Sequence, residues 1–451
     1  MLEQANRVHV DQVDWPALLP FVRLFRGFRM AIHPGKLGLA LLLVVLTYLG
    51  GLGMDLMWGQ PVQPGEIQRY LHSPTDDYNQ WLAQRDAAAT TGTAGVFETV
   101  LDVETRAFKN LIVSATQLNF GITGFLSGRG FNAGGVLGAL SIMVLGVPGW
   151  LYTTYPGFLA LFLTFAFLLT ALFGGAIARL AALQAARDLR PSAFAALRFT
   201  AARYPWFVLA PVIPFAVAVG LGLVLAVAGL IFFNVPGLDV VGALLFGVLL
   251  IVGFVMALIL IGLLIAAPLL LPAMAVEGTD AFDAISRGFN YIIGRPWHYL
   301  FYNAVYVVYG ALTYLFVGLV VYVTLWCTKV AVGLWAFADT DAGADRFDAI
   351  LPAPQLGELV HAVNWDALGG SAAVAAWIVL AWVKLLIALL PAFAVSFFFC
   401  EQTWIYLLLR RSIDGAELDE VHLEPEDEPT ATPTPDKIEP TAPDTTQTAA
   451  E

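Results

Sequence analysis

Long uncharged apolar runs recur along this chain of 451 residues, and the loops between them alternate between arginine-rich and arginine-poor. Lipid admits only segments that satisfy their own backbone hydrogen bonds, so such runs predict membrane-spanning helices. About six runs approach the roughly 20 residues that a helix needs to cross a bilayer. They are Leu37 to Met54, Phe158 to Ala178, Trp206 to Phe233, Val240 to Val276, Tyr299 to Trp326 and Ala372 to Phe399.

The composition excludes an ordinary soluble domain. Hydrophobic residues make up 59% of the chain and charged residues 13%, against roughly 25% charged residues in a typical soluble fold. The net charge of −12 is concentrated after Arg411, where many acids face the single Lys437. Basic residues flank the apolar runs and form no patch of the kind that binds nucleic acid, so the expected partners are the lipid bilayer and other membrane proteins.

The basic residues also predict the orientation, because short loops rich in Lys and Arg stay on the cytoplasmic side. Four basic groups fall on one side when the six spans are threaded in order, which places both termini in the cytoplasm. The segments 60–156 and 327–371 then face outward. The basic residues are Arg23, Arg26, Arg29, Lys36, Arg179, Arg187, Arg190, Arg198, Arg203, Arg287, Arg295, Arg410 and Arg411.

One apolar segment, Gly134 to Trp150, does not fit this count. A seventh span at that point would move every later arginine group to the opposite side. We therefore predict a helix that lies in the outer interface or enters the membrane and returns, and the glycines before it and Pro148 near its end suit a bent path. The predicted fold is an all-α polytopic transmembrane helical bundle.

The two ends of the chain differ from the body, 37–411. In the cytoplasmic lead, 1–36, Phe21 to Ile32 places apolar residues on one face and arginines on another, as in a helix that lies on the cytoplasmic leaflet. This helix serves as an anchor or recognises anionic lipid. The tail, 412–451, is acidic and rich in Pro and Thr, and we expect it to be disordered.

Two cytoplasmic segments, 191–207 and 279–299, repeat one pattern: a capping residue, a short amphipathic helix and a Pro-Trp pair. Ser192 and Thr279 are the expected caps, because a hydroxyl can accept a hydrogen bond from a free amide of the first turn. Proline suits the first turn of the helix that follows. A duplicated hairpin unit would explain the pattern.

Three stretches carry a resemblance to known proteins: GGAIARLAALQAARD (174–188), VEGTDAFDAISRGFNY (276–291) and IYLLLRRSIDGAELDEV (405–421). They resemble a group of uncharacterised bacterial multi-pass membrane proteins. The middle stretch is also similar to the membrane domain attached to some glycerophosphodiester phosphodiesterases. The resemblance implies a bacterial cytoplasmic-membrane protein and no reaction, because the phosphodiesterase catalytic domain has no counterpart in this chain.

Two charges interrupt the last apolar run. An ionisable group inside a span is a candidate for ion or proton passage, and Lys384 and Glu401 are such groups. The alternative for Lys384 is that the hydrocarbon part of the span lies closer to Leu386 to Leu409, in which case the lysine reaches outward to water. Glu401 would then lie in the inner half of the membrane.

A second group of charges, Glu277, Asp280, Asp283 and Arg287, surrounds the start of a cytoplasmic helix. Acids at this position favour the helix dipole, and Asp283 and Arg287 are spaced to form an ion pair across one turn. These two effects account for all four residues, although an acid-base or metal site is the alternative.

No catalytic, metal or cofactor pattern is present in the sequence. The six histidines are scattered, and the acidic segment 339–348 lacks the glycine and glutamate positions of a calcium-binding loop. The expected function is that of a non-enzymatic membrane scaffold or lipid-organising component. The alternatives are a transporter or channel subunit and, with only Glu277, Asp280 and Asp283 to support it, a membrane enzyme that acts on lipids.

Overall fold

The computed structural model describes residues 19–59, 61–74, 76–87, 92–336, 338–339, 345–355, 359 and 363–424. This part of the chain is helical, apart from two isolated β-bridges that pair Val62 with Ala94 and Asp339 with Asp345. Seven of its helices are long and apolar enough to cross a membrane. The predicted all-α polytopic fold is therefore confirmed.

Each of the six predicted spans corresponds to one of these helices, and each helix is longer than the apolar run that predicted it. The helices are α3 (Pro34–Trp58), α10 (Pro156–Arg187), α12 (Tyr204–Phe233), α13 (Leu238–Glu277), α15 (Pro296–Gly333), and α17 (Ser371–Ile387) followed by α18 (Leu389–Asp414). Proline lies in the first turn of α3, α10, α12 and α15, where its missing N–H costs no hydrogen bond.

The last span is divided into two helices at Ala388. Pro391 has no N–H to donate to the carbonyl oxygen of Ile387, so the regular hydrogen bonding of the helix cannot continue through this turn. The break separates an exposed helix, α17, from a buried one, α18.

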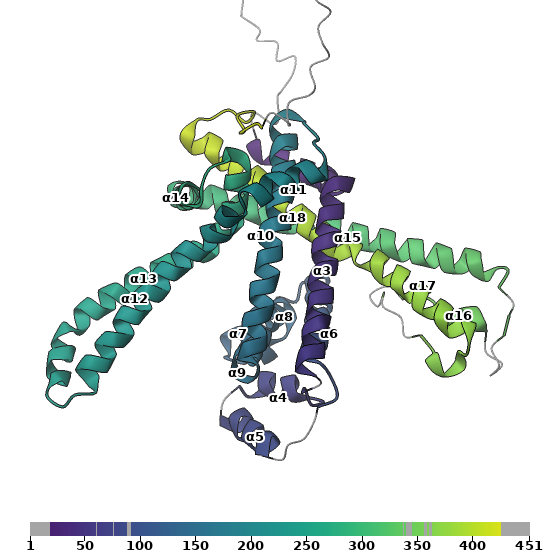
Figure 1. Ribbon diagram of the computed structural model, residues 1–451, viewed down its shortest axis with the longest axis horizontal. Helices are drawn as coiled ribbons and strands as arrows, with labels where there is room; N and C mark the ends of the chain where they lie inside the picture. Colours follow the sequence, from purple (N-terminus) through teal and green to yellow (C-terminus); the bar gives the residue numbers. More distant parts are fainter. Residues whose placement is uncertain are drawn as a thin grey trace, which may run out of the picture.

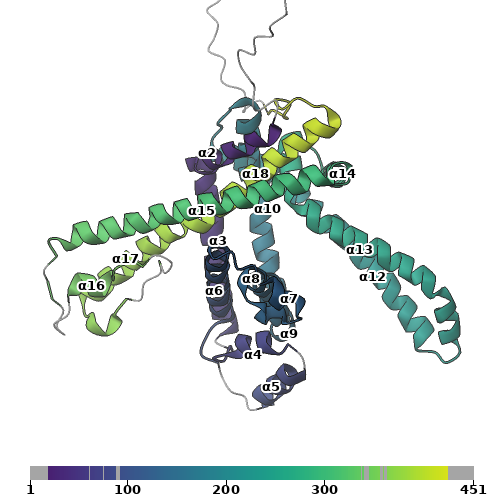
Figure 2. The same cartoon turned by 180° about the vertical axis from the view of Figure 1, so that it is seen from behind.

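The helices diverge from one place, which we call the junction (Figures 1 and 2). It comprises residues 171–183 of α10, 266–276 of α13 and 390–409 of α18, together with α2 (Gly27–Ala31) and α14 (Ala281–Gly294). From the junction, the α12–α13 hairpin, the α15–α17 hairpin and the α3–α10 pair extend in three different directions.

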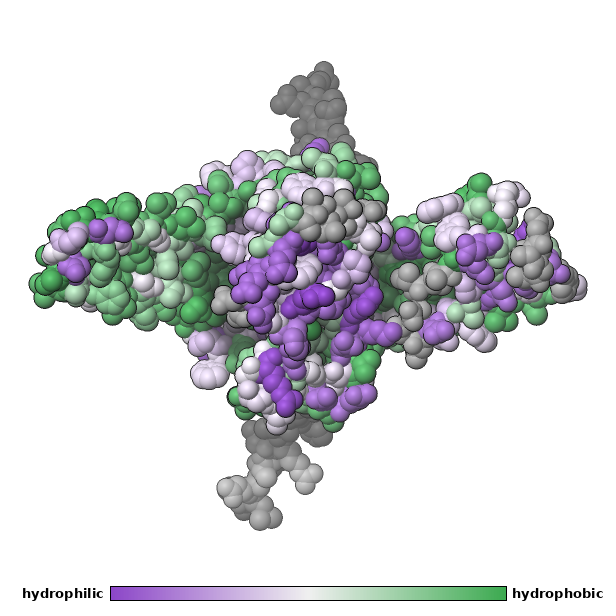
Figure 3. Space-filling view, turned by 90° about the horizontal axis from the view of Figure 1, so that it is seen from below, coloured by the Kyte–Doolittle hydropathy of each residue, from purple (hydrophilic) through white to green (hydrophobic). Residues whose placement is uncertain are grey.

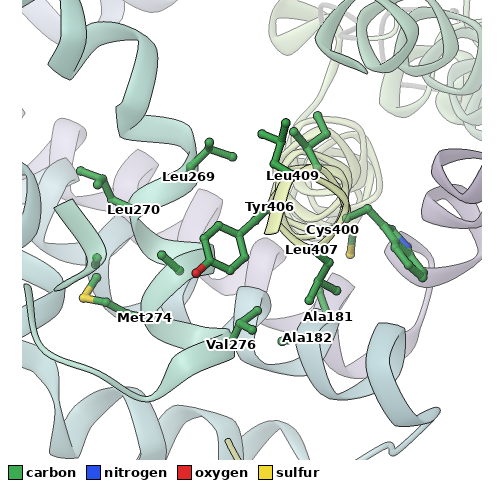
Figure 4. Packing of buried hydrophobic residues seen from close by; sticks show 14 of the residues in the cluster. Ala181, Ala182, Leu269, Leu270, Met274, Val276, Cys400, Tyr406, Leu407 and Leu409 are labelled. Carbon is green, nitrogen blue, oxygen red and sulfur yellow. The ribbon is translucent and has the colours of Figure 1, made fainter. Parts of the chain in front are cut away.

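Helix α18 is the centre of the junction, because nearly every residue from Ser396 to Leu409 is buried. Figure 4 shows side chains of α18 and α13 directed toward each other in this core. Two adjacent glycines let α10 approach α18 and α12 closely. A Cβ on Gly174 would lie 2.4 Å from the ring of Phe399 in α18, and one on Gly175 would lie 2.7 Å from Phe207 in α12.

The segment predicted to face outward, 60–156, which we continue to call the outward segment, lies at the end of α3 and α10 that is remote from the junction. Its elements are α4 (Glu66–His72), α5 (Asp76–Ala87), α6 (Val96–Thr116), α7 (Ile122–Leu126), η2 (Gly130–Ala133), α8 (Gly135–Ser141), the π-helical turn η3 (Ile142–Gly146) and α9 (Val147–Thr154). The shorter elements near the other outward loop are α16 (Arg346–Ile350) and η4 (Trp365–Ala367).

The seventh apolar helix, α8–η3–α9, leads the chain back to the end of α3, where the segment between α3 and α10 began. Helix α6 begins at the end of α3, where the carboxylate of Asp55 accepts hydrogen bonds from the amides of Phe97 and Glu98 at 2.8 and 3.0 Å. Helix α8 packs against α6, and α9 leads into the start of α10. The chain therefore leaves α3 and enters α10 at the same end of the molecule, and the interfacial or re-entrant placement of this helix stays a prediction.

The N-terminal amphipathic segment consists of the 3-10 helix η1 (Pro20–Arg26) and α2. It packs against α15 and α18 through Leu24, Met30 and Ala31, which are buried. Phe25 and Ile32, two of the four residues predicted on its apolar face, are exposed. The four predicted residues are Leu24, Phe25, Phe28 and Ile32: Phe25 lies in the 3-10 part, whose tighter turn changes the direction of its side chain, and Ile32 follows the end of α2.

The two repeated segments, which were predicted to lie on the cytoplasmic side, form α11 (Ala193–Ala202) and α14. Ser192 caps α11 as predicted, with its hydroxyl accepting from the amide of Ala195 at 3.1 Å. The prediction for Thr279 is wrong, because the carboxylate of Asp280 accepts from the amide of Asp283 and caps α14 instead.

The boundary of the disordered tail also requires correction. Helix α18 continues to Asp414, and residues 415–424 pack back onto the junction, where the backbone amide of His422 donates to the carbonyl of Val276 at 2.8 Å. Prediction of disorder from residue 412 rested on composition, and it missed the basic groups that bind the first acids of the tail. Residues 425–451 lie outside the described part of the chain.

Candidate functional site

Four of the six residues singled out in the sequence lie together at the junction, where α13 ends and α14 begins. Glu277 is the last residue of α13 and is the centre of the group. Its Oε1 accepts a hydrogen bond from the hydroxyl of Tyr406 at 3.0 Å and forms an ion pair with Arg410 at 2.8 Å. Glu277 therefore ties α13 to α18, and Figure 4 shows Tyr406 extending from α18 toward Met274 and Val276 of α13.

Arg287 of α14 joins the same group. It forms the expected pair with Asp283 at 2.9 Å, and it lies 3.5 Å from Glu277 and 3.9 Å from Asp414. Tyr291, one turn further along α14, donates to the carboxylate of Asp414. Burial and, as the second-largest cause, this hydrogen bond raise the pKa of Tyr291 to about 12, so its hydroxyl stays protonated at physiological pH.

The first ten residues after α18, residues 415–424, form a strap that covers the charged residues around Glu277. Arg203 forms an ion pair with Glu424 at 2.6 Å, and Arg187 donates to the carbonyl of Asp419 at 2.9 Å. The ring of Phe199 is flanked by two guanidinium groups, those of Arg179 at 4.2 Å and Arg203 at 4.3 Å. Acids and arginines that are far apart in the sequence thus connect α10, α11 and α18.

The carboxylates and guanidinium groups at this site neutralise one another's charges. Each of the three carboxylates Glu277, Asp283 and Asp414 lies within 4.0 Å of at least one guanidinium. An acid-base catalyst needs a carboxylate or amine that can reach a substrate, and here the acids are occupied by structural contacts. Asp280 caps α14 and is likewise engaged.

The other two candidates lie apart from this group and from each other. Lys384 is exposed on α17 and does not face the interior of the bundle, so its position offers no support for a pathway lined by it. Glu401 is completely buried in α18, against the N-terminal segment. Of the two intramembrane charges, Glu401 is therefore the one with an unusual environment.

A polar network in the outward segment was missed by the sequence analysis. The carboxylate of Glu66 is buried, pairs with Arg85 at 3.0 Å and accepts from the hydroxyl of Tyr155 at 3.1 Å. Nearby, Tyr78 accepts from the indole of Trp150 at 3.1 Å, and burial raises the pKa of Tyr78 to about 12. The partners are far apart in sequence, so no local spacing could have revealed them.

Within the described ranges, no three His, Cys, Asp or Glu side chains are grouped so that they could hold a metal ion. Residues 340–344 of the calcium-like segment 339–348 lie outside those ranges. A comparison of the chain with known protein families, with curated proteins and with solved structures finds no match. The resemblance to the phosphodiesterase membrane domain therefore stays a prediction.

Proposed function

We propose that this multi-pass membrane protein is a non-enzymatic scaffold or lipid-organising component of a bacterial cytoplasmic membrane. The observation that carries the proposal is the exposure of the α12–α13 hairpin. Its most apolar stretch in α13 has a mean hydropathy of 3.3, and none of that stretch is buried within the chain. Figure 3 shows the surface of this hairpin as almost uniformly hydrophobic up to its polar tip.

Such a hairpin differs from the helices of a transporter, which gather around a substrate site at the midplane of the membrane. Here α12 and α13 pack mainly on each other and join the rest of the chain only at the junction. Their outer surfaces, which include Phe215, Leu244 and Leu264, are available to lipid tails or to helices of another membrane protein.

One face of the hairpin has a shape that suits such contacts. An apolar groove runs between the two helices, lined on α12 by Ala218, Gly222 and Ala226 and on α13 by Met256 and Leu260. Small residues four apart on one helix face allow another helix or an acyl chain to approach closely.

Extraction of the protein from its native membrane within a patch of lipid, followed by mass spectrometry, tests the proposal. We expect a defined lipid class enriched over the surrounding membrane or one protein at fixed stoichiometry. Gly222→Leu fills the groove and is expected to abolish the enrichment. Gly229→Leu is the matched control, because a side chain at Gly229 meets no other atom within 4 Å. Absence of any enrichment from the unaltered protein would contradict the proposal.

Glu401 favours a second candidate function, transport of protons or cations, because it is an acid buried inside the bundle. Purified protein in liposomes would then conduct protons or a cation across the membrane, and Glu401→Gln would abolish that flux. Flux from the unaltered protein that is lost in Glu401→Gln would replace the scaffold proposal with transport.

A further inference from the structure

The carboxyl group of Glu401 has no hydrogen-bonding partner among the described residues. Its exposed fraction is 0%, and neither Oε1 nor Oε2 has a donor within reach. Most buried polar groups in proteins are paired, so this group requires an explanation. A charged carboxylate in such surroundings is strongly disfavoured, whereas a protonated one is tolerated far more easily.

The N-terminal segment, Pro20 to Ala31, covers this carboxyl group. A Cβ on Gly27 would lie 1.7 Å from Oε1 of Glu401, so the backbone of the segment rests directly on the acid. Side chains of α15 and α18 donate hydrogen bonds to the segment: Tyr309 to the carbonyl of Phe25 at 3.1 Å, Ser396 to that of Ala31 at 2.8 Å, and the indole of Trp404 to the sulfur of Met30 at 3.0 Å. Besides its apolar packing through Leu24, Met30 and Ala31, the docked segment therefore rests on the buried carboxyl group of Glu401.

Among the described residues, no cation forms an ion pair with Glu401. On the segment, Arg26 and Arg29 are exposed and Arg23 is half-buried, and none of them forms an ion pair with it. The other elements around the site contribute the hydroxyls of Tyr306 and Tyr309 from α15, the thiol of Cys400 from α18 and the ammonium of Lys36 from α3. Lys36 is directed to Gln184 of α10, to which it donates a hydrogen bond.

We propose that Glu401 is a proton-binding site and that its proton is bound only while the segment 20–31 is docked on α15 and α18. When the carboxyl group releases its proton to water, the resulting carboxylate must be hydrated, and hydration requires the segment to leave. The ligand is a single proton, and the exposed Arg26 and Arg29 can contact a membrane surface when the segment has left. This proposal does not depend on the scaffold function.

Limited trypsin digestion of the full chain in lipid nanodiscs tests the coupling. Cleavage after Arg26 and Arg29 requires the segment to undock, whereas the bond after Arg129 lies in an exposed loop and serves as the internal reference. We expect the ratio of the two cleavage rates to rise with pH, by up to about tenfold per pH unit, over the range in which the docked carboxyl group keeps its proton and the hydrated one has lost it, because undocking then releases one proton.

Three variants test whether Glu401 is the group whose proton controls the undocking of the segment. Glu401→Gln has no proton to release and is expected to keep the ratio low at every pH, and Glu401→Met, a second variant of similar volume, is expected to do the same. Glu417→Gln, which alters an exposed carboxylate, is expected to behave as the unaltered protein does. A ratio that is independent of pH in the unaltered protein, or a rise that persists in a folded Glu401 variant, would overturn the proposal.

Discussion

The hydroxyl of Tyr406 donates to Oε1 of Glu277 at 3.0 Å, and this contact joins α18 to α13 across 129 residues of sequence. Both residues come from segments that were expected to cross the membrane independently. Their meeting shows that the spans are held together at one end, by polar contacts as well as by apolar packing. The consequences of removing such contacts can be measured.

Tyr406→Phe is expected to destabilise the protein by about 1.5–3 kcal/mol, because hydrogen bonds to charged groups contribute roughly that much. The change removes only the hydroxyl and leaves the ring in the core. Thermal unfolding in detergent measures the effect. Tyr152→Phe is the control, since Tyr152 is 74% exposed. Equal unfolding temperatures for the two variants would show that the contact contributes nothing.

Arg85→Met tests the network in the outward segment. It leaves the buried carboxylate of Glu66 without its cation, which is expected to cost about 3–5 kcal/mol. The loss is expected to appear locally, as faster amide hydrogen exchange in α4 and α5. Arg106→Met is the matched control, because Arg106 pairs with Asp102 on an exposed helix face, where an ion pair contributes about 0–1 kcal/mol.

Gly174→Ala is expected to destabilise the junction by about 1–3 kcal/mol, because the added methyl group overlaps the ring of Phe399. Gly247→Ala adds the same group to α13 at a site with no atom within 4 Å, so it is expected to leave stability unchanged or to raise it slightly. Comparing the melting temperatures of the two variants separates close packing from helix propensity. A larger loss in Gly247→Ala would contradict the packing described here.

The spans could be predicted because their signal is local. An uncharged run such as 240–276 can be recognised from its own residues, and the arginine groups constrain the direction of threading. The prediction that Gly134 to Trp150 lies in the outer interface, or enters the membrane and returns, came from the same counting. The break before Pro391 was missed, because the residues around it, Leu385 to Cys400, are uncharged and form one continuous run.

The contacts at the junction could not be predicted, because they join residues that are remote in sequence. Arg410 was recognised only as a basic flank, and its partner Glu277 was assigned to helix capping. Lys36 and Arg179 were expected on a solvated cytoplasmic surface, yet both are buried, since other elements of the junction close over them. Hydropathy locates a helix in the membrane, but it does not specify which helix ends meet.

The N-terminus of α3 provides a test that depends on pH. His33 caps this helix, and its Nδ1 accepts a hydrogen bond from the amide of Gly35 at 3.3 Å. Only the neutral imidazole can accept at that nitrogen. Burial, followed by the nearby positive charges of Lys36 and Arg190, lowers the pKa of His33 below its usual value of 6.5.

Because the pKa is lower in the folded protein than in the unfolded chain, the stability that the cap contributes is present above about pH 6.5 and is lost as the pH falls below that value. His33→Asn keeps an acceptor that does not titrate in this range, so its stability is expected to change less between about pH 7 and pH 5 than that of the unaltered protein. His33→Ala is expected to lose about 1 kcal/mol at neutral pH and to show the same weak pH dependence. Thermal unfolding at the two pH values measures both effects, and an equally steep pH dependence in His33→Ala would mean that another group titrates instead.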